Sequence, residues 1–134
     1  MDQAAKEKYA KLFFIGALWN VFFAGLALLV PKLGRLLIFG FKNTATSAAV
    51  DLFYKISWAL ILVYGVGYYM VSRDPEKNRG VVWMGILGKL GFFFAVLQYY
   101  LKKTVTIVMM LGAFGDFVFS MLYSTFLFKT RNNA

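Results

Sequence analysis

Four long apolar stretches dominate this chain of 134 residues and leave few folds open to it. They run from about residue 12 to 30, 48 to 71, 81 to 101 and 105 to 128. Each is long enough to cross a bilayer core, which needs about 20 apolar residues. Because backbone polar groups in lipid must be paired within their own segment, each stretch is expected to be a helix. The sequence therefore predicts an all-α fold, a four-helix transmembrane bundle that forms a single domain over residues 1–134.

Composition supports a membrane protein and excludes several kinds of site. Hydrophobic residues make up 60% of the chain and charged residues 16%, which is too little charge to cover the apolar surface of a soluble domain. The chain has no cysteine and no histidine, so thiol chemistry, Cys/His metal sites and histidine-based catalysis are removed. We expect no catalytic residue set and no metal site.

The net charge of +9 is concentrated at the ends of the apolar stretches. This placement indicates membrane topology and contact with anionic lipid headgroups, and it does not favour nucleic acid as a partner. Eight basic residues lie near the ends of the spans on the side of the termini, and five lie near the ends on the opposite side. The positive-inside rule therefore predicts that both termini are in the cytoplasm. The eight are Lys6, Lys8, Lys11, Arg73, Lys77, Arg79, Lys129 and Arg131, and the five are Lys32, Arg35, Lys42, Lys102 and Lys103.

The segments that flank the first apolar stretch have features of their own. Asp2 and Glu7 precede it and no small-residue cleavage site follows it, so we expect a retained span rather than a cleaved signal peptide. The loop from Pro31 to Ser47 contains a segment too short to span and too apolar for water. We predict that this short segment lies in the interface between lipid and water.

Aromatic residues gather near the predicted ends of the spans, as in the belts that meet lipid headgroups. At the start of the second span, Asp51 and Lys55 stand four residues apart and predict a solvated ion pair. The rings that we assign to the belts are Tyr9, Tyr54, Trp58, Tyr68, Tyr69, Trp83, Tyr99, Tyr100 and Tyr123.

Two opposite charges lie inside the apolar stretches, Lys89 in the third and Asp116 in the fourth. With a rise of about 1.5 Å per residue, these two residues and Asn20 reach comparable depths, and Tyr64 lies near the same level. A charge at the centre of a span costs about 2.5–3.5 kcal/mol to insert, so an intramembrane ion pair between Lys89 and Asp116 is predicted. The sequence thus indicates one polar layer formed by Asn20, Tyr64, Lys89 and Asp116.

Glycine at i−4 shares the face of a helical residue and permits close approach of another helix. One glycine stands in this position before each of three layer residues: Gly16 before Asn20, Gly85 before Lys89 and Gly112 before Asp116. The pattern supports a layer that faces the inside of the bundle.

Several short strings resemble, in order and spacing, a subgroup of small bacterial membrane proteins near the DoxX-like families. They are Ala17-Leu18-Trp19-Asn20, Pro31, Phe39-Gly40, Tyr64-Gly65-Val66-Gly67-Tyr68, Arg73-Asp74-Pro75, Gly85-Ile86-Leu87-Gly88-Lys89 and Asp116. The resemblance implies a four-helix bundle in a bacterial inner membrane, in a group whose roles include quinone reduction and membrane assembly. More distant relatives, similar to sterol isomerases and sigma-2 proteins, hold an amine with buried acids. This chain departs from that pattern because Lys89 stands where it neutralises its one deep acid, Asp116.

Three functional interpretations stay open. In the leading one, an aromatic-lined cavity closed by Asn20, Tyr64, Lys89 and Asp116 binds a lipid, a quinone or another apolar molecule, and Lys89 donates a hydrogen bond to a ligand carbonyl. In the second, the ion pair only fixes helix register, and the protein is a structural or assembly partner of another membrane protein. In the third, a homo-oligomer forms a channel or transporter. Catalysis has the least support, since only Lys89 and Asp116 are available at depth.

Overall fold

The computed structural model describes residues 1–41 and 46–131, and these ranges contain helices and no strand. The helices are α1 (Gln3–Leu29), α2 (Pro31–Phe39), α3 (Ala48–Arg73), α4 (Arg79–Leu101) and α5 (Ile107–Lys129). This confirms the predicted all-α fold with a short segment between the first two long helices. The four long helices are each long and apolar enough to cross a membrane. Their outward faces carry large apolar side chains such as Phe22 and Leu87, as expected of a multi-pass integral membrane protein.

Side-chain caps set where three of the long helices begin. The Asp2 carboxylate accepts a hydrogen bond from Ala5 N at 2.7 Å, so α1 starts before its apolar stretch and includes the charged N-terminal segment. Ser47 caps α3 and Thr106 caps α5 in the same way. α2 begins at Pro31, a residue suited to the first turn of a helix, where its missing N–H is not needed.

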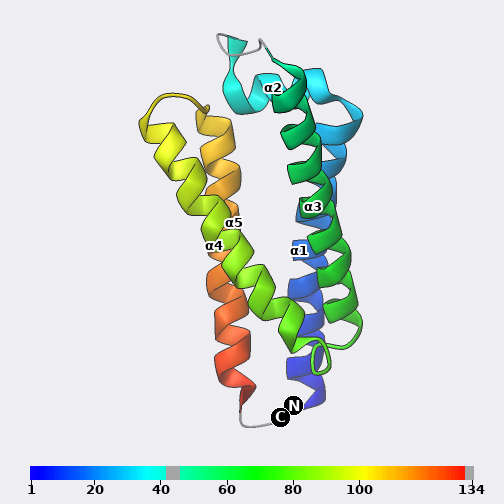
Figure 1. Cartoon of the computed structure of the whole chain (residues 1–134). Helices are drawn as coiled ribbons and strands as arrows, with labels where there is room; N and C mark the ends of the chain where they lie inside the picture. The colour runs from blue at the N-terminus through cyan, green and yellow to red at the C-terminus, as the bar shows by residue number, and fades with distance from the viewer. Residues whose placement is uncertain (42–45, 132–134) are drawn as a thin grey trace.

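The long helices form two hairpins, one of α1 and α3 and one of α4 and α5 (Figure 1). The start of α1 and the end of α5 lie at the same end of the bundle as the turn between α3 and α4, which we call the termini end. α2 lies across the opposite end, the α2 end, and α4 leans away from α3 in that direction. Lys42, one of the five basic residues counted for the α2 end, lies outside the described residues. The direction of the bundle in the membrane stays a prediction.

The half of the bundle nearer the termini end is filled by a continuous core. Side chains from α1, α3, α4 and α5 meet there, and several are fully buried. Phe13 packs between two rings of α5, with centroids 4.6 Å from Tyr123 and 5.1 Å from Phe126. The core comprises Tyr9, Phe13, Ala17, Tyr68, Val71, Val82, Ile86, Tyr123, Phe126 and Leu127.

Four of the nine rings that we assigned to interfacial belts are therefore inside the protein. Tyr9, Tyr54, Tyr68 and Tyr123 are each at most 8% exposed. Their position near the end of a span fixes their height and leaves open which face of the helix carries them. Here the helix face points inward, so these rings pack against other helices instead of headgroups.

A smaller cluster closes the α2 end. Ile38 of α2 packs with Ala27 and Tyr54, and the Tyr54 hydroxyl donates to Ala27 O at 3.0 Å. The loop before α5 is tied to α2, because Thr106 N donates to Ile38 O at 2.8 Å and the Thr106 hydroxyl donates to Leu37 O. α2 is thus bonded to both hairpins and caps the space between them.

Asp51 at the start of α3 pairs with Lys55 at 2.8 Å, the contact that its spacing predicts. It also pairs with Arg35 of α2 at 2.9 Å. The guanidinium group lies 5.5 Å from the centre of the Tyr54 ring. This ion-pair network therefore also fixes α2 on α3, a role that the spacing of Asp51 and Lys55 does not reveal.

Candidate functional site: a buried polar layer below a capped cavity

Lys89 lies in the middle of the bundle between one side chain from α1 and one from α5. Its Nζ donates a hydrogen bond to Asn20 Oδ1 at 3.0 Å and pairs with Asp116 Oδ1. Lys89 and Asn20 are each 5% exposed, and the Asp116 side chain is 15% exposed. These contacts join the two hairpins at a single level, so an ammonium group that would be costly alone is compensated.

Further contacts hold the amide and the ammonium group in place. Asn20 Nδ2 donates to Ile61 O at 3.1 Å, which brings α3 into the layer. Lys89 Nζ lies 5.3 Å from the centre of the Tyr68 ring and 5.4 Å from that of Phe119. Both distances are within the range of cation–π attraction. Lys89 therefore has two oxygen partners and two aromatic faces around its charge.

The Trp19 indole adjoins the layer on the side of Asp116. The ring packs closely on Gly115, where a Cβ would lie only 2.4 Å from it. Trp19 is thereby held against the helix that carries Asp116.

Tyr64 is near the layer without being bonded to it. Its ring stands 6.2 Å from that of Tyr68 and rests against Gly88, where a Cβ would be 3.5 Å away. Within the described residues, no hydrogen bond joins its hydroxyl to Asn20, Lys89 or Asp116. Tyr64 is thus a wall residue, whereas the other three predicted residues contact one another.

A capped cavity lies between the hairpins, on the α2 side of the polar layer. Measured as the space open to the centre of a water molecule, its volume is about 80 Å³, where one water needs about 10–15 Å³. All five helices contribute to its mostly apolar wall, and Asn20 and Asp116 are its polar floor. Apolar wall residues include Trp19, Phe23, Ala27, Ile38, Trp58, Phe92, Met109 and Gly112.

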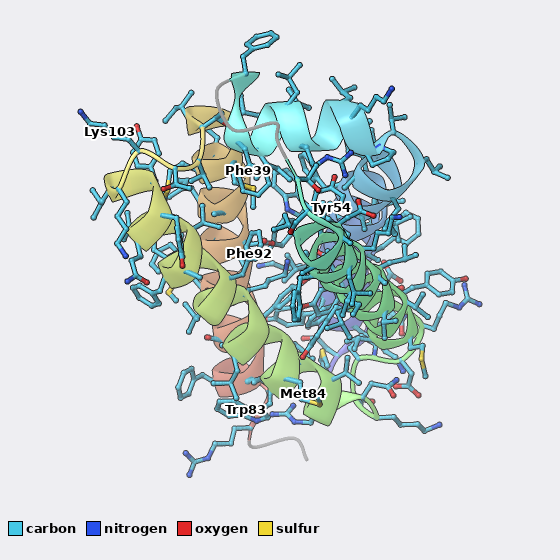
Figure 2. The ribbon with its side chains drawn as sticks, turned by 45° about the horizontal axis from the view of Figure 1, so that its top comes forward. Phe39, Tyr54, Trp83, Met84, Phe92 and Lys103 are labelled. Carbon is cyan, nitrogen blue, oxygen red and sulfur yellow. The ribbon has the colours of Figure 1, made fainter. Side chains whose placement is uncertain are left out.

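A second space, the side cavity, lies between α3 and α4 beside the layer and measures about 120 Å³ on the same scale. All four residues that the sequence singled out line it: Asn20, Tyr64, Lys89 and Asp116. Asn20, Ile61, Phe92 and Asp116 border both cavities, so the two spaces adjoin at the polar layer. In Figure 2, Phe92 projects from α4 into the space between the hairpins.

Two of the three glycines that precede the layer residues have the close contacts that the pattern predicts. A Cβ on Gly16 would lie 1.9 Å from the Tyr123 hydroxyl, and one on Gly85 would lie 2.6 Å from Tyr68. The interpretation is wrong for Gly112, since nothing lies within 4 Å of a Cβ built there. Gly112 faces the capped cavity instead, so its missing side chain leaves space open.

Sequence reasoning did not include three residues in the site: Trp19, Tyr68 and Phe92. Tyr68 and Phe92 each carry a signal that can be recognised afterwards. Tyr68 is one helical turn from Tyr64, and Phe92 lies three positions after Lys89, on the same helix face. No periodicity marks Trp19, whose ring lies beside the layer only because α1 and α5 approach at Gly115.

Within residues 1–41 and 46–131, no group of three or more acidic side chains could hold a metal ion. Compared with known proteins, the chain matches no family model, no curated protein and no solved structure. The resemblance to the DoxX-like families stays a prediction, as do the assembly and oligomeric-channel interpretations.

Proposed function

We propose that this chain binds an apolar small molecule, such as a lipid or a quinone, in the capped cavity. The observation that carries the proposal is the combination of an apolar wall from all five helices with a polar floor of Asn20 and Asp116. A few convergent polar groups in an apolar pocket are the usual composition of a ligand site. The apolar part of the ligand would occupy the space below α2, with its polar end at the layer.

Gly112 allows the cavity to be filled without disturbing the packed core. Nothing lies within 4 Å of a Cβ at this position, so Gly112→Leu extends into the cavity. Gly91 is the matched control, because a Cβ there also meets nothing and the residue is exposed on α4, outside both cavities. Both substitutions replace a helical glycine by the same better helix former.

The test is native mass spectrometry of the protein released from mild detergent. Wild type and Gly91→Leu are expected to retain a copurifying apolar molecule of defined mass, and Gly112→Leu is expected to lose it at unchanged thermal stability. Equal retention by all three proteins, or no retained molecule in wild type, would overturn the proposal.

A further inference from the structure

The polar layer has more free hydrogen-bond acceptors than donors on its cavity side. Lys89 directs two of its three N–H groups to Asn20 and Asp116, and the ring faces of Tyr68 and Phe119 flank its Nζ. A carboxylate has about four acceptor positions. Lys89 occupies one of them on Asp116. The remaining acceptor capacity belongs to the most exposed group of the layer, at 15% for the Asp116 side chain.

Asn20 supplies the remaining donor. Its Oδ1 accepts from Lys89, and one N–H of Nδ2 is donated to Ile61 O at 3.1 Å. The second N–H of the amide has no partner among the described residues. This N–H and the Asp116 carboxylate lie next to each other in the floor of the capped cavity. A ligand hydroxyl can satisfy both groups, because it can donate to the carboxylate and accept from the amide N–H.

The charges of the polar layer determine whether a charged or a neutral ligand is favoured. Lys89 and Asp116 neutralise each other, and among the described residues no other charged side chain lines the capped cavity. A charged ligand would enter an apolar space without a counter-ion, which is strongly unfavourable. A neutral ether or ketone has only acceptors, so it can accept from the free Asn20 N–H but leaves the free acceptor positions of Asp116 without a donor.

We propose that the ligand is a neutral alcohol with one slim apolar tail, whose hydroxyl donates to the Asp116 carboxylate and whose tail occupies the capped cavity. This inference rests on the proposed function and specifies the chemical class of the ligand. The tail is slim because the cavity measures about 80 Å³ on the scale where a water needs about 10–15 Å³. The contacts around Lys89 leave the Asp116 carboxylate, rather than the ammonium group, as the main ligand contact.

The test compares 1-dodecanol with dodecyl methyl ether, which keeps the chain and the oxygen but lacks the donor. Their binding to purified wild-type protein in one detergent is compared with binding to the double variant Lys89→Met/Asp116→Leu. The double variant carries no buried charge, and because partition into micelles is common to both proteins, it cancels in the comparison. A hydrogen bond to a charged group corresponds to a factor of about ten or more in affinity.

The expected result is an alcohol-to-ether affinity ratio that is about tenfold higher in wild type than in the double variant. Equal ratios in the two proteins would overturn the assignment of a donor-bearing ligand. If neither probe binds wild type, the inference also fails. The proposed function is then judged separately by the retained molecule in the Gly112→Leu and Gly91→Leu comparison. A double variant that does not fold is replaced by Asp116→Asn, whose carboxamide keeps one acceptor and is expected to lower the ratio in part.

Discussion

The two halves of this bundle are built from the same four long helices, yet one is filled and the other is hollow. In the termini half, rings from three helices fill the centre, and Phe13, Tyr123 and Phe126 are fully buried. In the α2 half, α4 leans away from α3 (Figure 1). The residues that line the capped cavity come from both hairpins and from α2. The polar layer of Asn20, Lys89 and Asp116 is the border between the two.

Two glycines at equivalent positions have different surroundings in the two halves. Gly16 and Gly112 each precede a layer residue by one turn. The Tyr123 hydroxyl packs against Gly16, whereas Gly112 faces open space. A small residue on a helix permits close approach, and whether a neighbour makes that approach depends on the distance between the helices. The same local pattern is a packing site in one half and part of a cavity wall in the other.

Removal of one charge from the polar layer is expected to change the free energy of unfolding the most. Asp116→Leu removes the partner of Lys89 and leaves a buried ammonium group uncompensated, which should lower the free energy of unfolding by about 3–5 kcal/mol. Lys89→Met/Asp116→Leu removes both charges and should recover most of that loss. Titration with a denaturing detergent measures both values. Equal losses in the single and double variants would mean that the layer stabilises through packing and not through charge.

A truncation in each half comes next in expected size. Phe13→Ala opens a void in the filled half, which should cost about 2–3 kcal/mol at about 24 cal/mol per Å³. The transfer contribution is absent because lipid is as apolar as the core. Phe92→Ala enlarges space that is already open, so the expected loss is about half as large or less. Similar losses for the two variants in the same titration would contradict the contrast between the halves.

The smallest effects are expected for alanine at the two glycines. Gly16→Ala drives a methyl group against the Tyr123 hydroxyl and should cost about 1–3 kcal/mol, whereas Gly112→Ala should be neutral or stabilise by up to about 1 kcal/mol. Thermal unfolding in one detergent checks the order of the two variants.

Tyr123→Phe supplies the control for Gly16→Ala. Among the described residues, the Tyr123 hydroxyl is buried without a hydrogen-bond partner, so its removal leaves no polar group unpaired. Combined with Gly16→Ala, Tyr123→Phe is expected to restore much of the lost stability. Failure to do so would show that the backbone of α1, and not the hydroxyl, resists the added methyl group.

Much of the fold follows from the sequence because lipid permits few alternatives. Apolar stretches of bilayer length must be helices, and the four stretches are found as α1, α3, α4 and α5. The pairing of Lys89 with Asp116 was predicted from cost and depth, and the structure places the two side chains in contact. In both cases a local property of the sequence was enough for the prediction: the length of a stretch, or a charge at a given depth.

For the aromatic residues, depth in the membrane does not predict whether a side chain is buried or exposed. Tyr68 and Tyr69 are neighbours near the end of one span, yet Tyr68 is 1% exposed and Tyr69 is 47% exposed. Depth is the same for both, and only the rotation of α3 against its neighbours separates a core ring from an outward one. Periodicity alone gives a weak signal for this rotation when nearly all faces of a membrane helix are apolar.

Four helices of membrane-spanning length and a charged pair at one level can be predicted from the sequence alone, because both follow from the energetics of polar groups in lipid. The arrangement of these helices as two hairpins, tight at the termini end and apart below α2, is visible only in the tertiary structure. The cavity, its cap, and the role of Gly112 depend on the distances between helices. Those distances result from side chains of four helices packing together, which no single segment encodes.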